Sequence, residues 1–312
     1  MVKRARRVVF AVFSTLFVQG AVAACPDVDE EALAWLDKMS RIPHEQSYHG
    51  VVTLQRGESI EVFQVSHIVG DRQSSERLTQ LTGQGAQVDR ASHPLNCIHP
   101  GQQLLRIGSQ MRMGQRGIAE QYRISVGTDA RVAGRSAIQL HVVPRDMYRF
   151  GYRMLLDRET ALLLQAETFG RGKKPLETLR FARVAFGPSA PGSGVGDTLH
   201  RAGHPHPDTI SGKPVVDRPW RVSWLPGGFT ATDSPDAFSG RRSYTDGLAV
   251  MSVFLEELER ELHPGEGLVR EGGTTSYTRG MHIDDQPVLV TVIGEVPVNT
   301  ARMVADSVQW VE

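Results

Sequence analysis

The stretch VAGRSAIQLHVVPRDMYRFGYRMLLDRETALLLQAETF, from Val132 to Phe169, decides the fold class. Three of its segments alternate apolar and polar residues, which is the pattern of a β-strand with one apolar face. The apolar positions are Ile138, Leu140 and Val142, then Tyr152, Met154 and Leu156, then Leu162, Leu164 and Ala166. The connections between the segments are short, whereas a parallel pair of strands needs a crossover of a dozen or more residues. The stretch therefore predicts three antiparallel strands, whose apolar face must be covered by a helix, a second sheet or a ligand.

The first 24 residues have the pattern of a secretory signal. Four basic residues, Lys3, Arg4, Arg6 and Arg7, precede an apolar run over residues 8–18, and small residues occupy positions 21–24. This order predicts a signal peptide over residues 1–24 and an exported mature chain. Without these residues, 31 Lys and Arg stand against 35 Asp and Glu, a net charge of −4. This charge argues against nucleic acid as a partner.

The two cysteines, Cys25 and Cys97, allow three interpretations. The string Val22-Ala23-Ala24-Cys25 resembles a lipobox, which would make Cys25 a lipidated N-terminus. A disulfide between Cys25 and Cys97 would instead contribute ~3 kcal/mol by closing a long loop in an oxidising compartment. Cys25 can also be a free thiol. The disulfide is the preferred assignment, and the other two stay open because spacing does not determine connectivity.

The segment after the signal predicts a helix and further strands of the same sheet. Residues 29–39 place acidic residues in a first helical turn and apolar residues at helical spacing. Two strands follow around the turn at residues 56–58. Val52 and Leu54 share a face of the first strand, and Phe63 and Val65 share a face of the second. Together with candidates up to residue 107, at 122–126 and at 176–186, residues 25–186 predict a curved antiparallel sheet of eight or more strands with one or two helices.

A linker separates this unit from a second one. Residues 187–217 are rich in Gly, Pro and Ser and lack apolar periodicity, which predicts a flexible linker. Residues 218–312 predict a small α+β domain. In it, Asp246-Gly247 predicts a two-residue hairpin turn, and the strand that follows is apolar on both faces and therefore central. A strand over residues 287–294 and a helix over residues 300–308, with Asn299 as its N-cap, are expected to cover it.

The chain offers no placed catalytic or metal site. His44-Glu45 begins a string like that of zinc hydrolases, but Tyr48 stands where the second His is required. No serine or cysteine has a base whose position the sequence fixes. Three histidines in the linker could meet a metal, but adventitious binding or none is the preferred interpretation: His200, His204 and His206. We therefore predict a protein that is not an enzyme and holds no cofactor or metal.

The apolar face of the large sheet can be an ordinary core or the wall of a cavity that holds acyl chains. Burial contributes ~0.8 kcal/mol per methylene, so a chain of about a dozen carbons provides on the order of 10 kcal/mol before ordering costs. The residues predicted to line this lipid cavity are Val52, Leu54, Phe63, Val65, Ile138, Leu140, Val142, Met154 and Leu156. In the second unit, Trp224, Phe229 and Tyr244 are predicted to bind a protein partner, with a place in the core as the alternative.

Six segments, taken in order between Trp35 and about Val308, closely resemble the RseB/MucB family of periplasmic regulators of envelope-stress sigma factors. They are SYHGVVTLQRG, SERLTQLTG, the opening stretch up to Leu164, WLPGGFT, YTDGLAVMSVFLE and VTVIGEVPVNTARMVADSV. The resemblance implies an α+β protein whose large domain is similar to the LolA/LolB lipoprotein carriers, an unclosed β-barrel with helices, followed by a smaller α+β domain. The linker and Cys25 depart from the family pattern, which leaves the domain geometry and the anchoring open.

The resemblance also implies a function in the periplasm. The protein is expected to bind the periplasmic segment of a membrane anti-sigma factor of the RseA or MucA type and to protect it from the first-site protease. It is expected to release this segment when lipopolysaccharide or another lipid binds. The alternative is a carrier of lipid or lipoprotein of the LolA/LolB type. The sequence leaves open the lipid, the surface that meets the anti-sigma factor, and the oligomeric state, a homo-oligomer included.

Overall fold

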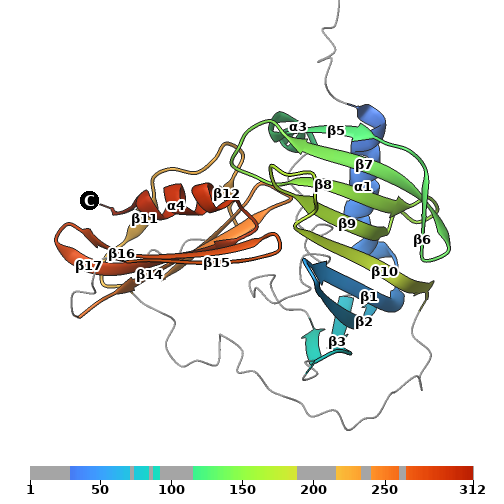
Figure 1. The fold of residues 1–312 in the computed structure, drawn as a ribbon, viewed down its shortest axis with the longest axis horizontal. Coiled ribbons are helices and arrows are strands. Elements are labelled where there is room, and N and C mark those ends of the chain that lie inside the picture. The colour runs from blue at the N-terminus through green and yellow to red at the C-terminus, as the bar shows by residue number, and fades with distance from the viewer. Residues whose placement is uncertain are drawn as a thin grey trace, which may run out of the picture.

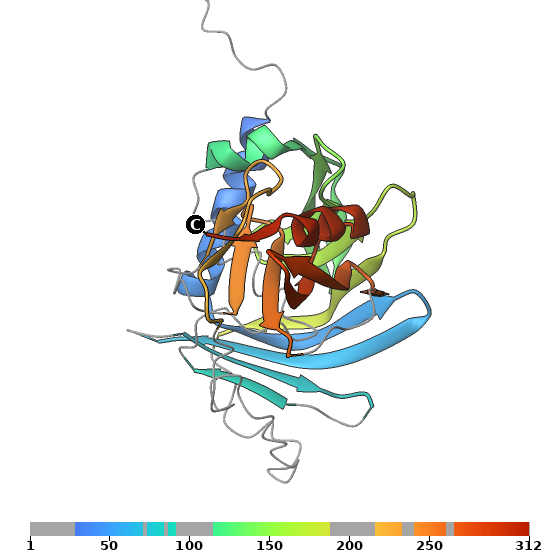
Figure 2. The same cartoon turned by 90° about the vertical axis from the view of Figure 1, so that its left-hand side faces the viewer.

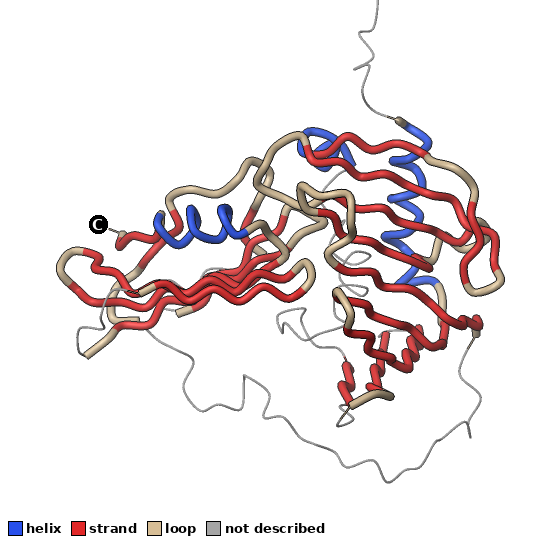
Figure 3. The backbone as a smooth tube through the Cα atoms, viewed as in Figure 1, coloured by secondary structure: helices blue, strands red, loops and turns tan. Residues whose placement is uncertain are grey.

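The computed structural model describes residues 29–70, 74–83, 87–91, 115–187, 216–232, 240–259 and 265–311. Figure 1 shows two units, each a sheet with a helix against one face. The backbone trace in Figure 3 shows that strands make up most of both units. All strand pairs in the described residues are antiparallel, and helices pack against the sheets, which confirms the predicted α+β class.

The larger unit is built on ten strands in the order β4-β3-β2-β1-β10-β9-β8-β7-β5, with β6 paired to β7. Strands β4 and β5 lie at opposite ends of this order, so the described strands form an open sheet, as expected for an unclosed barrel. Figure 2 shows its bend between β1 to β3 and β5 to β8. The elements are α1 (Glu30–Glu45), β1 (Tyr48–Arg56), β2 (Ser59–Val69), β3 (Ser74–Gln80), β4 (Gln87–Ala91), α3 (Gln115–Gln121), β5 (Tyr122–Val126), β6 (Ala130–Val132), β7 (Arg135–Pro144), β8 (Gly151–Asp157), β9 (Leu163–Phe169) and β10 (Glu177–Phe186).

The three strands predicted from the opening stretch are confirmed as β7, β8 and β9, which pair in sequence order. The predicted alternation of the third strand is wrong at its start, because β9 begins at Leu163 and a register shift places Leu163, not Leu164, opposite Leu156. The strand over residues 122–126 and the hairpin around residues 56–58 are also confirmed. The helix predicted over residues 29–39 is α1, which continues to Glu45. Asp29 caps it, since its Oδ1 accepts a hydrogen bond from the backbone N–H of Ala32 at 3.1 Å.

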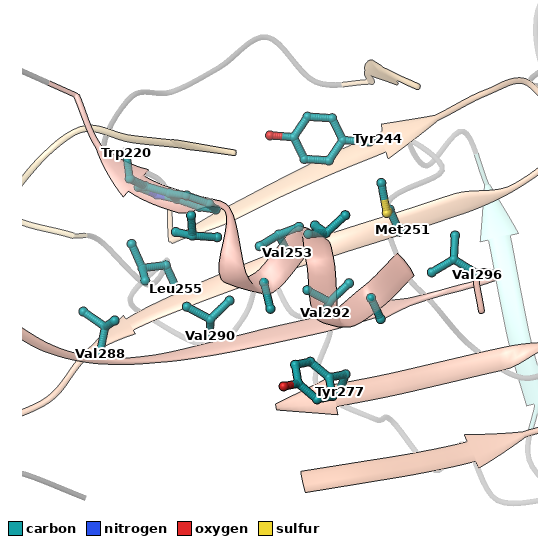
Figure 4. Close-up of a cluster of buried hydrophobic side chains, with 14 of the residues drawn as sticks. Trp220, Tyr244, Met251, Val253, Leu255, Tyr277, Val288, Val290, Val292 and Val296 are labelled. Carbon is teal, nitrogen blue, oxygen red and sulfur yellow. The ribbon is translucent and has the colours of Figure 1, made fainter. Parts of the chain in front are cut away.

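The smaller unit contains a six-stranded sheet in the order β12-β13-β14-β17-β16-β15 and a separate pair, β11 with β18. Strand β14 is central, as predicted, and Met251, Val253 and Leu255 on it are fully buried beneath α4. Figure 4 shows this core, with side chains of β14 and β17 directed at the helix. The elements are β11 (Trp220–Val222), β12 (Thr230–Ala231), β13 (Arg241–Thr245), β14 (Val250–Glu257), β15 (Glu266–Glu271), β16 (Thr274–Ile283), β17 (Gln286–Gly294), α4 (Val298–Asp306) and β18 (Val308–Trp310).

Two local predictions in this unit are wrong. The β13–β14 connection has four residues, because Thr245 pairs with Val250, so Asp246-Gly247 is not a two-residue turn. The carboxylate of Asp246 instead folds the loop by accepting two backbone hydrogen bonds. Helix α4 begins at Val298, before the predicted cap Asn299, with Pro297 at its N-cap and no side-chain capping bond. Val216, within the predicted linker, is buried in the core of this unit.

Several predictions lie outside the described residues. They concern the signal peptide over residues 1–24, the pairing or lipidation of Cys25 and Cys97, and the three linker histidines. Within the described part of the chain, no helix is long and apolar enough to cross a membrane. There, too, no three His, Cys, Asp or Glu side chains gather as metal ligands would.

Candidate functional site

The inner face of the large sheet carries all nine residues predicted to line the lipid cavity. Residues directly opposite each other on antiparallel strands point to the same face. One row of opposed residues runs through Leu54, Leu179, Ala166, Met154 and Leu140, from β1 across β10, β9 and β8 to β7. Other opposed pairs on this face are Val52 with Phe63, Val65 with Leu78, Ile138 with Leu156 and Val142 with Tyr152. The strand alternation therefore predicts the face of each of these side chains correctly.

Helix α1 lies across this face and is bonded to the sheet at both ends (Figure 1). At its start, Oδ2 of Asp29 accepts a hydrogen bond from the backbone N–H of Val126 in β5 at 2.9 Å. This bond is the main reason that the pKa of Asp29 lies below its usual value. Near its other end, Nε2 of His67 in β2 donates to the backbone carbonyl of Pro43 at 2.9 Å. The helix is thus held against both arms of the bent sheet.

The nine side chains are covered by protein in this conformation, with at most 5% of any one exposed. Ile138, Leu140, Val142, Met154 and Leu156 share a buried cluster with Ala32, Leu36 and Met39 of α1. Val52, Leu54, Phe63 and Val65 lie in a second cluster with Ile42 of the same helix. The lipid cavity remains a prediction, and an acyl chain could reach this face only if α1 or another covering element moved.

The loop between β7 and β8 joins the two units through Arg149. The guanidinium of Arg149 is fully buried, and its Nη1 donates to Oδ2 of Asp246 at 2.9 Å. Its Nη2 donates to the backbone carbonyl of Gly227 at 2.5 Å. The same guanidinium lies over the rings of Tyr122 and Phe229, at 5.5 and 5.4 Å from their centroids. Asp146 of the same loop also pairs with Arg149 at 3.1 Å, so this charged side chain of the large unit is held by groups of both units.

Asp246 is the counterpart of Arg149, and both of its oxygens are used. Oδ1 accepts the backbone N–H groups of Leu248 and Ala249 at 3.0 and 2.8 Å. Oδ2 accepts the hydroxyl of Tyr122 at 2.9 Å, in addition to Arg149. Burial raises the pKa of Tyr122 well above its usual range, and the charge of Asp246 raises it further. The carboxylate therefore shapes its own loop and binds two residues of the other unit.

Three further polar contacts join the units. Next to Arg149, the hydroxyl of Thr300 in α4 donates to the backbone carbonyl of Tyr148 at 2.8 Å. On the β1–β10 side, the carboxylate of Glu177 accepts the backbone N–H of Gly273 at 3.1 Å. Arg56 bridges the units there, with Nη1 at 2.9 Å from Oε1 of Glu271. The small unit thus lies against one end of the large sheet.

The three aromatic residues predicted to bind a partner differ in their exposure. Trp224 is partly exposed, and its ring packs edge-on against Tyr148 of the large unit, with centroids 5.2 Å apart. Phe229 and Tyr244 are each 7% exposed and belong to the core of the small unit. In this conformation only Trp224 presents surface to a partner, and the partner-binding role of all three remains a prediction.

Sequence reasoning did not identify the contact between the units. Arg149 and Asp246 are 97 residues apart, and each lies in a loop that has no apolar periodicity. The sequence carried only a weak signal. The Asp246-Gly247 pair between two apolar segments predicted a turn, but nothing in it indicated that the Asp246 carboxylate also binds Arg149 of the other unit.

Comparisons with known proteins agree over both units. The sequence profile of the MucB/RseB N-terminal domain matches residues 31–199, and that of the MucB/RseB C-terminal domain matches residues 215–309. The sigma factor AlgU regulatory protein MucB of Pseudomonas aeruginosa is 31% identical, over 95% of this chain and 96% of that protein. The sigma-E factor regulatory protein RseB of Haemophilus influenzae is 23% identical, over 96% of this chain and 98% of that protein.

Solved structures of MucB are similar as well. The crystal structure of MucB in complex with MucA(peri) has a TM-score of 0.68 and 30% sequence identity, covering 90% of this chain and 99% of that chain. The crystal structure of MucB has a TM-score of 0.64 and 30% identity, covering 91% of this chain and 99% of that chain. The similarity therefore includes both units.

Proposed function

The chain belongs to the MucB/RseB family, and from this premise we propose that it is a periplasmic regulator that binds the periplasmic segment of a membrane anti-sigma factor. Bound in this way, the segment is protected from the protease that would otherwise release the sigma factor. The observation that carries the proposal is the likeness, over 90% of this chain, to MucB in its complex with MucA(peri). The likeness covers both units and therefore supports the proposal for the chain as a whole.

The experiment that tests this proposal is a binding measurement with the purified mature chain. The ligand is the periplasmic segment of the anti-sigma factor from the same genome, and a scrambled segment of equal composition is the control. Isothermal titration calorimetry is expected to detect saturable binding of the native segment alone, and the bound segment should be cut more slowly by a site-one protease. Equal binding of both segments, or equal cleavage with and without the protein, contradicts the proposal.

We further propose that a lipid opens this complex by entering the inner face of the large sheet. The nine predicted residues form two apolar patches on one face, connected by Leu179 of β10 and Ala166 of β9. Burial of each methylene contributes about 0.8 kcal/mol. To change from mostly bound to mostly free, the two arrangements must differ in lipid affinity by about 5.5 kcal/mol. Seven to eight methylenes buried in one arrangement and not in the other would provide this difference, so one acyl chain is sufficient.

Leu140, which lies on β7 and is fully buried in the inner face, is the residue at which to test lipid release. Leu140→Asp is expected to abolish release of the anti-sigma segment by lipopolysaccharide while binding of the segment persists. Circular dichroism checks that the variant is folded. If Leu140→Asp unfolds, Leu156→Phe is used in its place, because it reduces the space at the inner face without adding a charge. If every one of these variants that folds releases the segment as wild type does, lipid does not enter at the inner face.

A further inference from the structure

Leu248 lies in the core of the unit to which it does not belong. It follows β13 of the small unit, yet it is only 2% exposed and shares the buried cluster of Leu140, Met154 and α1 in the large unit. The next residue, Ala249, belongs to the core of the small unit. The β13–β14 loop therefore inserts one leucine into the neighbouring domain.

The place that Leu248 occupies, which we call the Leu248 seat, continues the inner face. Tyr122 and Tyr152 belong to the same buried cluster, and Tyr152 lies opposite Val142 in the sheet. A Cβ atom on Gly247, next to Leu248, would lie 3.4 Å from the side chain of Ile118. The seat is thus made by apolar and aromatic side chains at the small-unit end of the surface on which we placed the lipid.

We propose that the Leu248 seat is the inner end of an acyl-chain site, filled by the protein's own leucine when no ligand is bound. The inference rests on the proposed lipid response and adds to it the subsite and the residue with which the ligand competes. A leucine side chain and the end of an acyl chain have similar width and are both apolar, so either can fill the seat but not both.

The loop that carries Leu248 also holds the polar contact between the units. Oδ1 of Asp246 accepts the backbone N–H of Leu248, and Oδ2 accepts Arg149 and Tyr122. A ligand that displaces Leu248 must move this backbone N–H and therefore disturb the carboxylate that bonds to the other unit. Displacement of an apolar side chain is in this way linked to loss of the buried ion pair.

One buried polar group at the same place is not satisfied in this arrangement. The hydroxyl of Tyr152 is buried and has no hydrogen-bond partner among the described residues. Burial raises the pKa of this hydroxyl well above its usual range, and the nearby carboxylates of Glu295, Asp246 and Glu177 raise it further. Burying a hydroxyl without a hydrogen-bond partner costs free energy. This cost lowers the stability of the contact between the units and favours its reversible opening.

The test compares Leu248→Ala with Leu255→Ala in the full mature chain. Both leucines belong to the small unit in sequence and both are buried. Leu248 packs in the core of the large unit, whereas Leu255 packs in the core of the small unit. The probe is dansyl-labelled undecanoic acid, whose fluorescence rises on entering an apolar site. Leu248→Ala is expected to bind the probe about tenfold more tightly than wild type, equivalent to about 1.4 kcal/mol. Leu255→Ala is expected to match wild type. Leu248→Trp, which keeps the seat filled, is expected to weaken binding.

Equal probe affinity in wild type, Leu248→Ala and Leu248→Trp overturns the subsite and leaves the lipid response standing. If neither the wild type nor either variant binds the probe, both the subsite and the lipid response are overturned. Binding of the anti-sigma segment is measured in a separate experiment, so its outcome is judged independently. A thiol provides a direct readout. In a chain with Cys25→Ser and Cys97→Ser, the Leu248→Cys variant should react with a maleimide faster when the probe is present. Slower or unchanged reaction on probe binding contradicts displacement of this residue.

Discussion

Asp246→Asn should separate the two units more effectively than any change on their surface. The substitution keeps Oδ1, which folds the β13–β14 loop, and replaces Oδ2, which accepts Arg149 and Tyr122, by an amide nitrogen. Arg149 then retains Asp146 and the Gly227 carbonyl as partners, but its buried guanidinium loses its fully buried counter-charge. The change therefore affects the contact between the units and spares the local turn.

The size of the effect follows from the burial of the pair. Removing one partner of a buried ion pair costs 3–5 kcal/mol as a rule, because an uncompensated charge stays in the interior. Since Asp146 still approaches Arg149 at 3.1 Å, we expect a loss of about 3 kcal/mol, at the lower end of this range. The control is Asp284→Asn, because its pair with Arg218 is 3.6 Å long and both side chains are at least half exposed. That substitution should cost less than about 1 kcal/mol.

Urea denaturation followed by tryptophan fluorescence measures both free energies of unfolding. Arg149→Met is the second substitution of a double-mutant cycle, because it removes the charge that Asp246→Asn leaves without a counter-charge. In an Arg149→Met chain, Asp246→Asn should cost much less than in wild type, which a double-mutant cycle reports as a coupling energy. If Asp246→Asn costs no more than Asp284→Asn, or if the two changes are additive, the pair does not hold the units together and our reasoning fails.

Three other substitutions test single contacts. Asp29→Ala removes the cap of α1 and its bond to β5 and should lower the free energy of unfolding by about 1–2 kcal/mol in urea, with a smaller loss for Asp29→Asn; equal stability of Asp29→Ala and wild type contradicts this. Asp157 is buried, which would raise its pKa, but hydrogen bonds from Arg135 and Thr160 outweigh burial and lower it. Its contribution to stability is therefore complete above the unfolded-state pKa of about 3.9 and is lost as the pH falls through the lower folded-state value. Asp157→Asn should flatten the decline of thermal stability between about pH 5 and pH 2, and an unchanged slope refutes the assignment. Gly272→Ala, at φ +57°, would place a Cβ atom 2.4 Å from Oε2 of Glu177, whereas Gly57→Ala at φ +58° meets nothing within 4 Å. Gly272→Ala should lower the free energy of unfolding more than Gly57→Ala, which carries only the backbone penalty of about 1–3 kcal/mol. Equal losses for the two variants would show that the close approach to Glu177 does not destabilise the protein.

The polar contact between the units and the apolar inner face are adjacent, which bears on regulation. Leu248 joins the inner-face cluster, and the two residues before it in the loop approach Tyr122, Arg149 and Ile118 of the large unit. A ligand that filled the proposed site at this end of the inner face would therefore be sterically incompatible with the present arrangement of the units. A domain rearrangement caused by lipid needs such a difference in contacts between its two states.

The strand alternation in residues 132–169 determined more about this protein than any other sequence feature. Because side chains alternate at a period of two, the apolar positions of this stretch predicted three strands and five of the nine inner-face residues, and the same alternation in residues 48–69 predicted the other four. Helix α1 was likewise visible from its acidic first turn and apolar stripe. These properties are local, and each depends on residues at most a few positions apart.

Only the tertiary structure decided what covers the inner face and how the two units meet. Arg149, Asp246 and Leu248 lie in loops, where no periodicity indicates direction, and their partners are about 100 residues away. The same composition would allow Phe229 and Tyr244 to lie at a surface or in a core, and the structure places both in a core. The physical reason is that burial of a loop side chain depends on which surfaces dock, and docking is a property of the assembled domains.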